Sequence, residues 1–378
     1  MKQVYFDYNA TTPVDKRIID AMMPYFLESF GNPSNSNSPH GREANRAFKN
    51  ALRTIAEYFK VESSDDIILT SGATESNNLI LNSVVDTSEK PCRIITTRIE
   101  HDSILKTLES FGGKVIIDYV ENDDNGVIDL RDFENKIQDN TVLITIIGAN
   151  NEIGTIQPIH EIAEIAKKHN VPFHCDATQL IPHQRIDLSQ LEIDYLSLSG
   201  HKIYAPKGVG LLICRNDRAL SRIRPQILGG GQQNGYRSGT INVPGAVGIA
   251  EAIKLLDSEI EKDHAHKQAL FDAFFSVLNR RQIPYHLNGD PVHRINGNIS
   301  VAIEGLTSIQ LLAMLPEYSI STGSACSTGK KSHVLKALRC PDSVVSGTIR
   351  IGFGRFSEQK EIVKLANKIA DCYCSVNS

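Results

Sequence analysis

The sequence predicts an α/β protein with a mainly parallel sheet, followed by a smaller second α/β unit. Three features indicate this class: apolar runs typical of strands, helical segments between these runs, and one very long helix after them. Strands that are apolar throughout belong inside a sheet that is covered on both faces. Repeated strand–helix–strand units place such strands parallel to one another.

The predicted strands of the main sheet are apolar and rich in β-branched residues. They are residues 67–70, 93–97, 114–120, 142–148, 171–177, 194–200 and 208–215. Residues 159–169, between two of these runs, carry Ile159, Ile162 and Ala163 at the i, i+3, i+4 spacing of one helix face. The pattern therefore predicts β-α-β units.

A long helix follows the predicted sheet strands. Residues 246–278 form a helical pattern well beyond the usual length of about 10–14 residues, so we expect this helix to bridge two domains. After it come a strand at 298–304, a helix at 308–315 and a strand at 348–354. A last amphipathic helix follows, with Ser357 as its candidate N-cap. These elements predict the smaller α/β domain.

Composition and charge exclude several classes of function. The 378 residues include 40 Lys and Arg against 44 Asp and Glu, a formal net charge of −4, which is unlike the basic surface of a nucleic-acid or anionic-membrane binder. No segment has the roughly 18 uninterrupted apolar residues that span a bilayer, and the start does not resemble a signal peptide. The seven cysteines lack the spacing of a zinc site. We expect a cytoplasmic protein without metal, nucleic-acid or membrane partners.

Two strand ends carry residues suited to aldehyde-cofactor chemistry. Lys202 lies in a Gly/Pro-rich turn after an apolar strand, where a lysine can lose solvation and attack a carbonyl. When this segment is taken alone, a solvated turn lysine is the more common explanation. Asp176 ends another buried strand, either as a helix cap or buried ion-pair member, or as the carboxylate that pairs with the pyridine nitrogen of pyridoxal phosphate.

A candidate phosphate site follows the strand at 67–70. Residues 70–78 offer small hydroxyl side chains and backbone N–H groups at a helix start, which is either a phosphate cradle or only a capped helix. The segment lacks the GxxxxGK[ST] pattern of nucleoside-triphosphate sites. Ser199 and His201 lie close to Lys202 in the sequence and are further donors for the same phosphate.

Three further segments carry candidate site residues. His101 follows the strand at 93–97, where it either stacks on a planar cofactor or is structural. Residues 150–154 either hold a substrate carboxylate or only form a turn. Cys326 lies among Gly, Ser, Thr and two lysines, and because positive charge favours a thiolate, we interpret it as a nucleophile rather than a core residue.

Taken together and in order, these segments resemble the cysteine desulfurases, a branch of the class V group of fold-type I pyridoxal-phosphate enzymes. The matching motifs are at 5–13, 71–78, 100–103, 150–154, 176–179, 199–208, 229–240, 323–329 and 349–356. The resemblance implies a large cofactor domain at 15–258 around a mainly parallel seven-stranded sheet. It also implies a small domain built from 1–14 and 259–378.

The resemblance also implies which residues hold the cofactor. Lys202 would carry pyridoxal phosphate and Asp176 would pair with its pyridine nitrogen, while Gln179 contacts the ring hydroxyl and His101 stacks on the ring. The residues implied to bind the phosphate are Ala73, Thr74, Ser199 and His201. Thr240 would reach the phosphate of a neighbouring subunit, which implies a homodimer with shared sites.

Substrate and sulfur would be held by a second group of residues. Asn151 and Arg350 are implied to bind the substrate carboxylate, for which a guanidinium is well suited. Cys326 is implied to take the sulfur as a persulfide on a mobile loop. The family pattern usually has an acidic residue where this chain has Gln233, a departure that we expect to alter a local ion pair.

The implied activity is conversion of L-cysteine to L-alanine, with the sulfur delivered to an acceptor protein. Iron–sulfur cluster assembly, tRNA thiolation and DNA sulfur modification are all compatible destinations. A selenocysteine lyase or another class V aminotransferase is the first alternative. A sulfur-trafficking scaffold that has kept the fold without enzymatic activity is the second.

Overall fold

The computed structural model describes residues 3–322 and 332–377. Its largest sheet has seven strands: β2 (Ile67–Thr70), β3 (Cys92–Thr97), β4 (Val115–Val120), β5 (Thr141–Ile147), β6 (Phe173–Asp176), β7 (Tyr195–Ser199) and β8 (Gly210–Cys214). Their order across the sheet is β2-β8-β7-β6-β5-β3-β4. Strand β8 is antiparallel to β2 and β7, whereas the pairings from β7 to β4 are parallel. The predicted mainly parallel sheet is confirmed.

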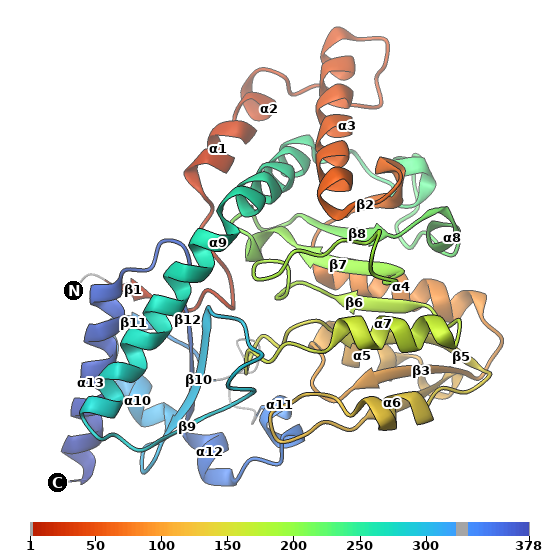
Figure 1. Ribbon diagram of the computed structural model, residues 1–378. Helices are drawn as coiled ribbons and strands as arrows, with labels where there is room; N and C mark the ends of the chain where they lie inside the picture. Colours follow the sequence, from red (N-terminus) through yellow and green to blue (C-terminus); the bar gives the residue numbers. More distant parts are fainter. Residues whose placement is uncertain (1–2, 323–331, 378) are drawn as a thin grey trace.

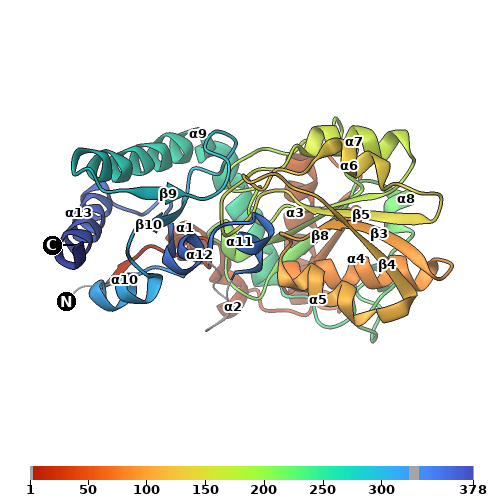
Figure 2. The same ribbon diagram turned by 90° about the horizontal axis from the view of Figure 1, so that it is seen from below.

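Helices cover both faces of this sheet. They are α3 (Pro39–Phe59), α4 (Ala73–Thr87), α5 (Asp102–Ser110), α6 (Leu130–Asn135), α7 (Ile159–Lys168) and α8 (Asp217–Leu220). Figure 2 shows α4 and α5 on one face and α6 and α7 on the other. Successive residues of a strand alternate between the two cores, with Ile67 and Leu69 in one and Ile68 in the other. Double coverage explains why the strands are apolar throughout.

Helix α9 (Val243–Arg280) connects the sheet core to a second core. Ile249 and Ile253 in its first half pack with the sheet, and Phe274 and Leu278 in its last turns pack into the second core. Figure 1 shows the helix running from beside α3 to β9. The predicted long bridging helix is therefore confirmed. Within the described residues, no helix is both long and apolar enough to cross a membrane.

The second core surrounds a three-stranded antiparallel sheet in the order β12-β10-β9. Its strands are β9 (Tyr285–Leu287), β10 (Asn298–Ile303) and β12 (Thr348–Gly352), and the helices of this region are α10 (Ser308–Met314), α11 (His333–Ala337), α12 (Asp342–Gly347) and α13 (Gln359–Asn377). The N-terminal strand β1 (Val4–Tyr5) pairs with β11 (Tyr318–Ser319), and the following Phe6 is buried in this core. The short helices α1 (Lys16–Met22) and α2 (Pro24–Leu27) lie between β1 and α3. The division at 14/15 and 258/259 stays a prediction.

The predicted N-cap at Ser357 is wrong. Helix α13 begins at Gln359, and Glu358 precedes it. The Ser357 hydroxyl accepts a hydrogen bond from the Gly354 N–H at 3.1 Å, while the Ser357 N–H donates to the Gly354 carbonyl at 3.0 Å. Ser357 therefore closes the turn after β12, because its side chain points back along the chain rather than into the helix.

Candidate active site

A cavity of about 790 Å³ lies at the carboxyl ends of the parallel strands. In open α/β sheets this edge is the usual place for a ligand, because parallel strands deliver their following loops to one side. The predicted site residues that line the cavity are Ala73, Thr74, His101, Asn151, Asp176, Gln179, Ser199, His201, Lys202 and Arg350. The structure thus brings together residues from five strand ends and from β12.

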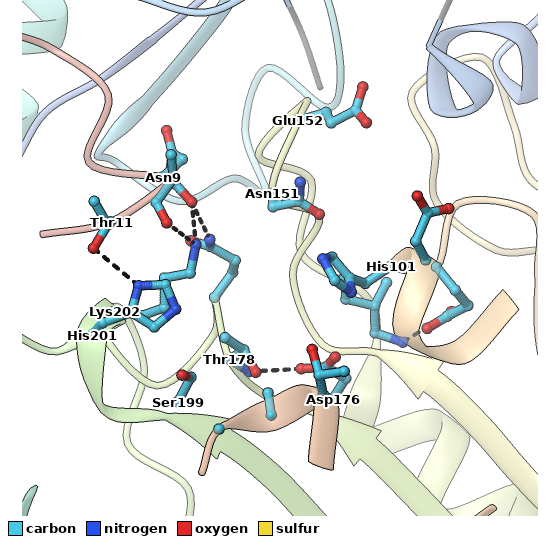
Figure 3. A pocket seen from close by; sticks show the side chains of 18 of the residues that line it. Asn9, Thr11, His101, Asn151, Glu152, Asp176, Thr178, Ser199, His201 and Lys202 are labelled. Carbon is cyan, nitrogen blue, oxygen red and sulfur yellow. Dashed lines mark hydrogen bonds between the residues drawn. The ribbon is translucent and has the colours of Figure 1, made fainter. Parts of the chain in front are cut away.

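The N-terminal segment holds the turn that carries Lys202. Lys202 Nζ donates to the backbone carbonyls of Asn9 and Ala10, the latter at 2.8 Å (Figure 3). Thr12 Oγ1 donates to the His201 carbonyl and accepts from the Tyr204 N–H, both at 3.0 Å. Sequence reasoning missed these roles, and the only signal was the motif at 5–13.

Asp176 is fixed at the base of the cavity. Its side chain is buried, with Oδ2 accepting from Asn77 Nδ2 at 2.8 Å and Oδ1 accepting from the Thr178 N–H at 3.1 Å. Asn77 lies on α4 and was not predicted from the sequence. Gln179 Nε2 donates to the Asn9 carbonyl at 2.9 Å, so the same N-terminal carbonyl receives Lys202 and Gln179. The two bonds to Asp176 fix the orientation of its carboxylate in the cavity.

The start of α4 forms the corner predicted to bind a phosphate. Gly72 precedes the helix and provides no side-chain cap, so N–H groups of the first turn lack a capping side chain among the described residues. Such a helix start favours an anion. Ser199 Oγ lies within 3.5 Å of where a Cβ on Gly72 would be. The His201 ring meets Thr11 Oγ1 at 3.0 Å.

His201 and Glu100 are both neutral at pH 7. Burial, together with the charges of Lys202 and Lys207, lowers the pKa of His201 to about 4. Burial raises the pKa of Glu100 to about 8. Glu100 lines the cavity, and its Oε1 accepts from Thr97 Oγ1 at 2.7 Å and from the Ile147 N–H at 3.0 Å. Glu100 is part of the motif at 100–103, but the sequence indicated no role for it.

His101 lies across the cavity from Lys202 (Figure 3). It caps α5, because its Nδ1 accepts from the Ser103 N–H at 3.1 Å. The Ser103 hydroxyl approaches the same nitrogen at 2.8 Å. The ring is therefore held in one orientation by the helix that follows it, and its predicted stacking on a cofactor ring stays a prediction.

Arg350 and Asn151 meet at another corner of the cavity. Arg350 is fully buried on β12, with one nitrogen donating to Asp7 Oδ1 at 2.9 Å and another to the Asn151 carbonyl at 3.0 Å. Asn150 Oδ1 accepts the N–H groups of two following residues at 2.8 and 3.1 Å, which shapes the turn that carries Asn151. The guanidinium is thus held beside the segment predicted to bind substrate.

Two predicted residues are not among the cavity residues of this chain. Thr240 is exposed and does not line the cavity, and Cys326 lies outside the described residues. Ser332 and His333 come directly after that gap; the Ser332 hydroxyl donates to Glu152 Oε2 at 2.5 Å, and His333 Nε2 meets the Glu100 carbonyl at 3.0 Å. The first described residues after Cys326 therefore lie beside the cavity. In the described ranges, no group of three or more His, Cys, Asp or Glu side chains could hold a metal.

The donor set fits pyridoxal phosphate. One cavity carries a lysine amine, a fixed carboxylate, and a helix start that has no side-chain cap but has the Ser199 hydroxyl beside it. The His201 imidazole lines the same cavity. These groups match an aldehyde, a ring nitrogen and a phosphate respectively. Lys202, Asp176 and the start of α4 would hold these three parts.

Comparisons with known proteins identify the family of the chain. The aminotransferase class-V family model matches residues 4–365. The cysteine desulfurase IscS of Rickettsia bellii is 40% identical over 97% of this chain and 92% of its own length. The mitosomal cysteine desulfurase of Trachipleistophora hominis is 39% identical over 97% of this chain and 85% of its own length.

Solved structures agree as well. A NifS-like protein superposes with a TM-score of 0.90 at 36% identity, covering 99% of this chain and all of its own. SspA, solved in complex with cysteine, superposes with a TM-score of 0.80 at 34% identity, covering 94% of this chain and 99% of its own. The chain therefore belongs to the cysteine desulfurases, a pyridoxal-phosphate-dependent branch of the class V aminotransferase family.

Proposed function

We propose that the chain converts L-cysteine to L-alanine and passes the sulfur, as a persulfide on Cys326, to an acceptor protein. The observation that carries this proposal is the grouping of Lys202, Asp176 and the start of α4 around one cavity, in which His101 lies across from Lys202. The relative SspA was solved in complex with cysteine, which supports cysteine as the substrate.

The residues at the base of the cavity have different tasks. When bound, pyridoxal phosphate supplies an aldehyde for the substrate amine and a ring that takes up the electron pair released at the α-carbon. Lys202 Nζ would bind the aldehyde carbon and, once displaced by substrate, accept the α-proton. Asp176 would keep the ring nitrogen protonated, because its carboxylate is held in place by Asn77. His101 would pack on the ring.

Substrate is held from the opposite corner. The Arg350 guanidinium would bind the cysteine carboxylate together with Asn151. Cys326 thiolate would then attack the substrate sulfur, so that a sulfur–sulfur bond forms and the substrate carbon–sulfur bond breaks. The electron pair of that bond stays with the carbon skeleton, which gains protons and leaves as alanine. A thiol of the acceptor protein then takes the outer sulfur from Cys326.

A homodimer completes the proposed site. Thr240 would bind the phosphate held by the other subunit, which is consistent with its exposed position away from this chain's own cavity. Large apolar side chains are also exposed along residues 19–30, including Phe26, Leu27 and Phe30 at 54%, 66% and 67%. A surface of this kind suits burial against a second copy.

The cellular setting belongs to the same proposal. We place the enzyme in the cytoplasm, although one relative is named mitosomal. The acceptor protein would deliver the sulfur to iron–sulfur cluster assembly, tRNA thiolation or DNA sulfur modification. Mass spectrometry of the partner that becomes persulfidated in the presence of cysteine distinguishes them.

Two experiments test the core of this proposal. Cys326→Ser should keep the visible absorbance of bound cofactor but produce no alanine from cysteine in turnover, whereas the control Cys340→Ser should retain activity. Borohydride reduction of the wild type followed by peptide mapping should find the pyridoxyl adduct on Lys202. Undiminished alanine production by Cys326→Ser, or an adduct on another lysine, would contradict the proposal.

A further inference from the structure

Tyr204, two residues after Lys202, has a left-handed backbone conformation with φ of +66°. It comes shortly after the short 3₁₀ turn Gly200–Lys202. Positions of this kind after a helical turn usually carry glycine, because a side chain at positive φ crowds the backbone. A bulky residue persists there only where its surroundings impose the conformation.

Contacts from two parts of the chain hold Tyr204. Its N–H donates to Thr12 Oγ1 and its carbonyl accepts from the Asp15 N–H, both at 3.0 Å. Its phenolic oxygen accepts from the Arg355 N–H at 2.8 Å, and the Arg355 guanidinium lies 4.7 Å from the centre of its ring. The side chain is buried. The conformation is therefore fixed from both the N-terminal segment and the segment after β12.

Arg355 is itself held rigidly. Its guanidinium binds the Asp263 carboxylate of α9 through contacts of 2.8 and 3.2 Å, and it also meets Asp15 and Glu259 at 3.1 Å. The backbone of Gly354 packs so closely that a Cβ there would lie 2.4 Å from the Tyr204 phenolic oxygen. The segment after β12 thus holds the phenol of Tyr204 in place.

The same segment continues the strand that carries Arg350. Strand β12 ends at Gly352, so Arg355 lies five positions beyond the predicted substrate-binding arginine. On the other side, Tyr204 lies directly after Ile203, which follows the lysine turn. Tyr204 is therefore the point where the backbone after Arg350 bonds to the turn of Lys202.

We propose that Tyr204 is a positioning residue that transmits the placement of the segment after β12 to Lys202. The inference rests on the proposed role of Lys202. Without the phenolic oxygen of Tyr204, the half-buried Arg355 N–H loses its acceptor, and Tyr204 loses one of the contacts that impose its left-handed conformation. The turn then relaxes, and Lys202 Nζ shifts relative to the carbonyls of Asn9 and Ala10.

Tyr204→Phe tests this inference in the cofactor-loaded enzyme. We expect kcat to fall about 10-fold or more with KM changed less than about 2-fold, because a small displacement of a reacting group mainly affects the chemical step. We also expect the pH midpoint of the bound cofactor's absorbance change to move by at least about 0.5 unit, because that midpoint reports the surroundings of the Lys202 nitrogen. This spectroscopic readout does not depend on turnover.

Tyr195→Phe is the matched control. Tyr195 is also a buried tyrosine whose hydroxyl makes one backbone bond, to the Ala219 carbonyl at 2.9 Å, and it does not line the cavity. It should lose stability without any change in kcat or in the absorbance midpoint. If Tyr204→Phe behaves in the same way, Tyr204 is only structural and the inference is overturned.

Asp263→Asn provides the second variant if Tyr204→Phe does not fold. It weakens the ion pair that holds Arg355, from outside the cavity. A shift of the absorbance midpoint by at least about 0.5 unit supports the inference. An unchanged midpoint overturns it. Borohydride trapping separates this outcome from the proposed function: an adduct at Lys202 with unchanged variants rejects only the role of Tyr204, whereas an adduct elsewhere rejects the role of Lys202.

Discussion

Lys202 Nζ donates to the Ala10 carbonyl at 2.8 Å, although the two residues are 192 positions apart in the chain. Thr12 extends the same contact, because its hydroxyl bridges the backbone on both sides of Lys202. These bonds join a segment assigned to the predicted small domain with the lysine turn of the predicted large domain. The amine is thus held from outside the sheet that carries it.

Thr12→Val should destabilise the lysine turn. Valine keeps the shape of threonine but leaves the buried Tyr204 N–H without its acceptor at 3.0 Å. An unpaired buried donor costs about 1–3 kcal/mol. We expect the free energy of unfolding, measured with urea, to fall by that amount, and we expect bound cofactor to dissociate faster in gel filtration.

Thr96→Val is the control for that substitution. Thr96 is fully buried on β3, and its hydroxyl has no hydrogen-bond partner within the described part of the chain. Valine at this position should leave the free energy of unfolding unchanged or raise it, since no bond is lost. Equal losses in the two variants would show that the Thr12 bridge contributes nothing specific.

Glu100 should make the protein less stable as the pH rises. Its pKa is about 8 in the folded chain against 4.5 in its ordinary state, so between these values the folded state binds the proton and the unfolded state does not. Stability therefore falls with rising pH across this window. Glu100→Gln removes this titration and should gain up to about 5 kcal/mol relative to wild type between pH 4 and pH 9.

Urea unfolding at several pH values measures this effect. Glu109→Gln is the control, because Glu109 is exposed and pairs with Lys106 one turn away on the helix surface. Its stability should follow the wild-type pH profile. A Glu100→Gln profile that runs parallel to the wild type across the whole range would mean that Glu100 is charged in the folded protein at pH 7.

Some of the site could be predicted from the sequence because strand ends are local features. Asp176, Lys202 and His101 each follow an apolar strand, and parallel strands bring their ends to one edge. The contacts of Asn9 and Thr12 were not predictable, because nothing in the sequence near the lysine indicates a bond to residues about 190 positions away. Burial is also a tertiary property, so the neutral state of Glu100 could not be predicted.

Arg350→Lys should weaken substrate binding more than it slows the reaction. The guanidinium reaches Asp7 and the Asn151 carbonyl at once, and a lysine ammonium cannot reproduce that planar fork. We expect KM for cysteine to rise on the order of 10-fold to 100-fold while cofactor absorbance is kept. The control Arg339→Lys changes an exposed arginine that pairs with Glu121 and should leave KM unaltered. An unchanged KM in Arg350→Lys would place the carboxylate elsewhere.

Gln233 shows why an acidic residue would not be equivalent at its position in this chain. Its amide oxygen accepts from the Leu69 N–H at 2.7 Å and its amide nitrogen donates to the Leu69 carbonyl at 3.0 Å. Leu69 lies on β2, the last strand on one side of the main sheet. The side chain therefore pairs with the edge strand as another strand would, which requires a donor and an acceptor. The sequence predicted an altered ion pair at position 233. The structure shows instead a side chain that pairs with the backbone of the edge strand.

Gln233→Glu should cost about 1–2 kcal/mol of stability at neutral pH, because a carboxylate keeps the bond from the Leu69 N–H but faces the Leu69 carbonyl without a proton to donate. The proton returns as the pH falls below the pKa of the new carboxyl group, so part of the loss should be recovered near pH 4. Gln232→Glu is the control, since Gln232 Oε1 accepts from the Gly239 N–H at 2.8 Å, a role that a carboxylate retains. Urea unfolding of both variants at pH 4 and pH 7 measures the difference. If Gln233→Glu is as stable as Gln232→Glu at pH 7, the donated bond to the edge strand has no net value.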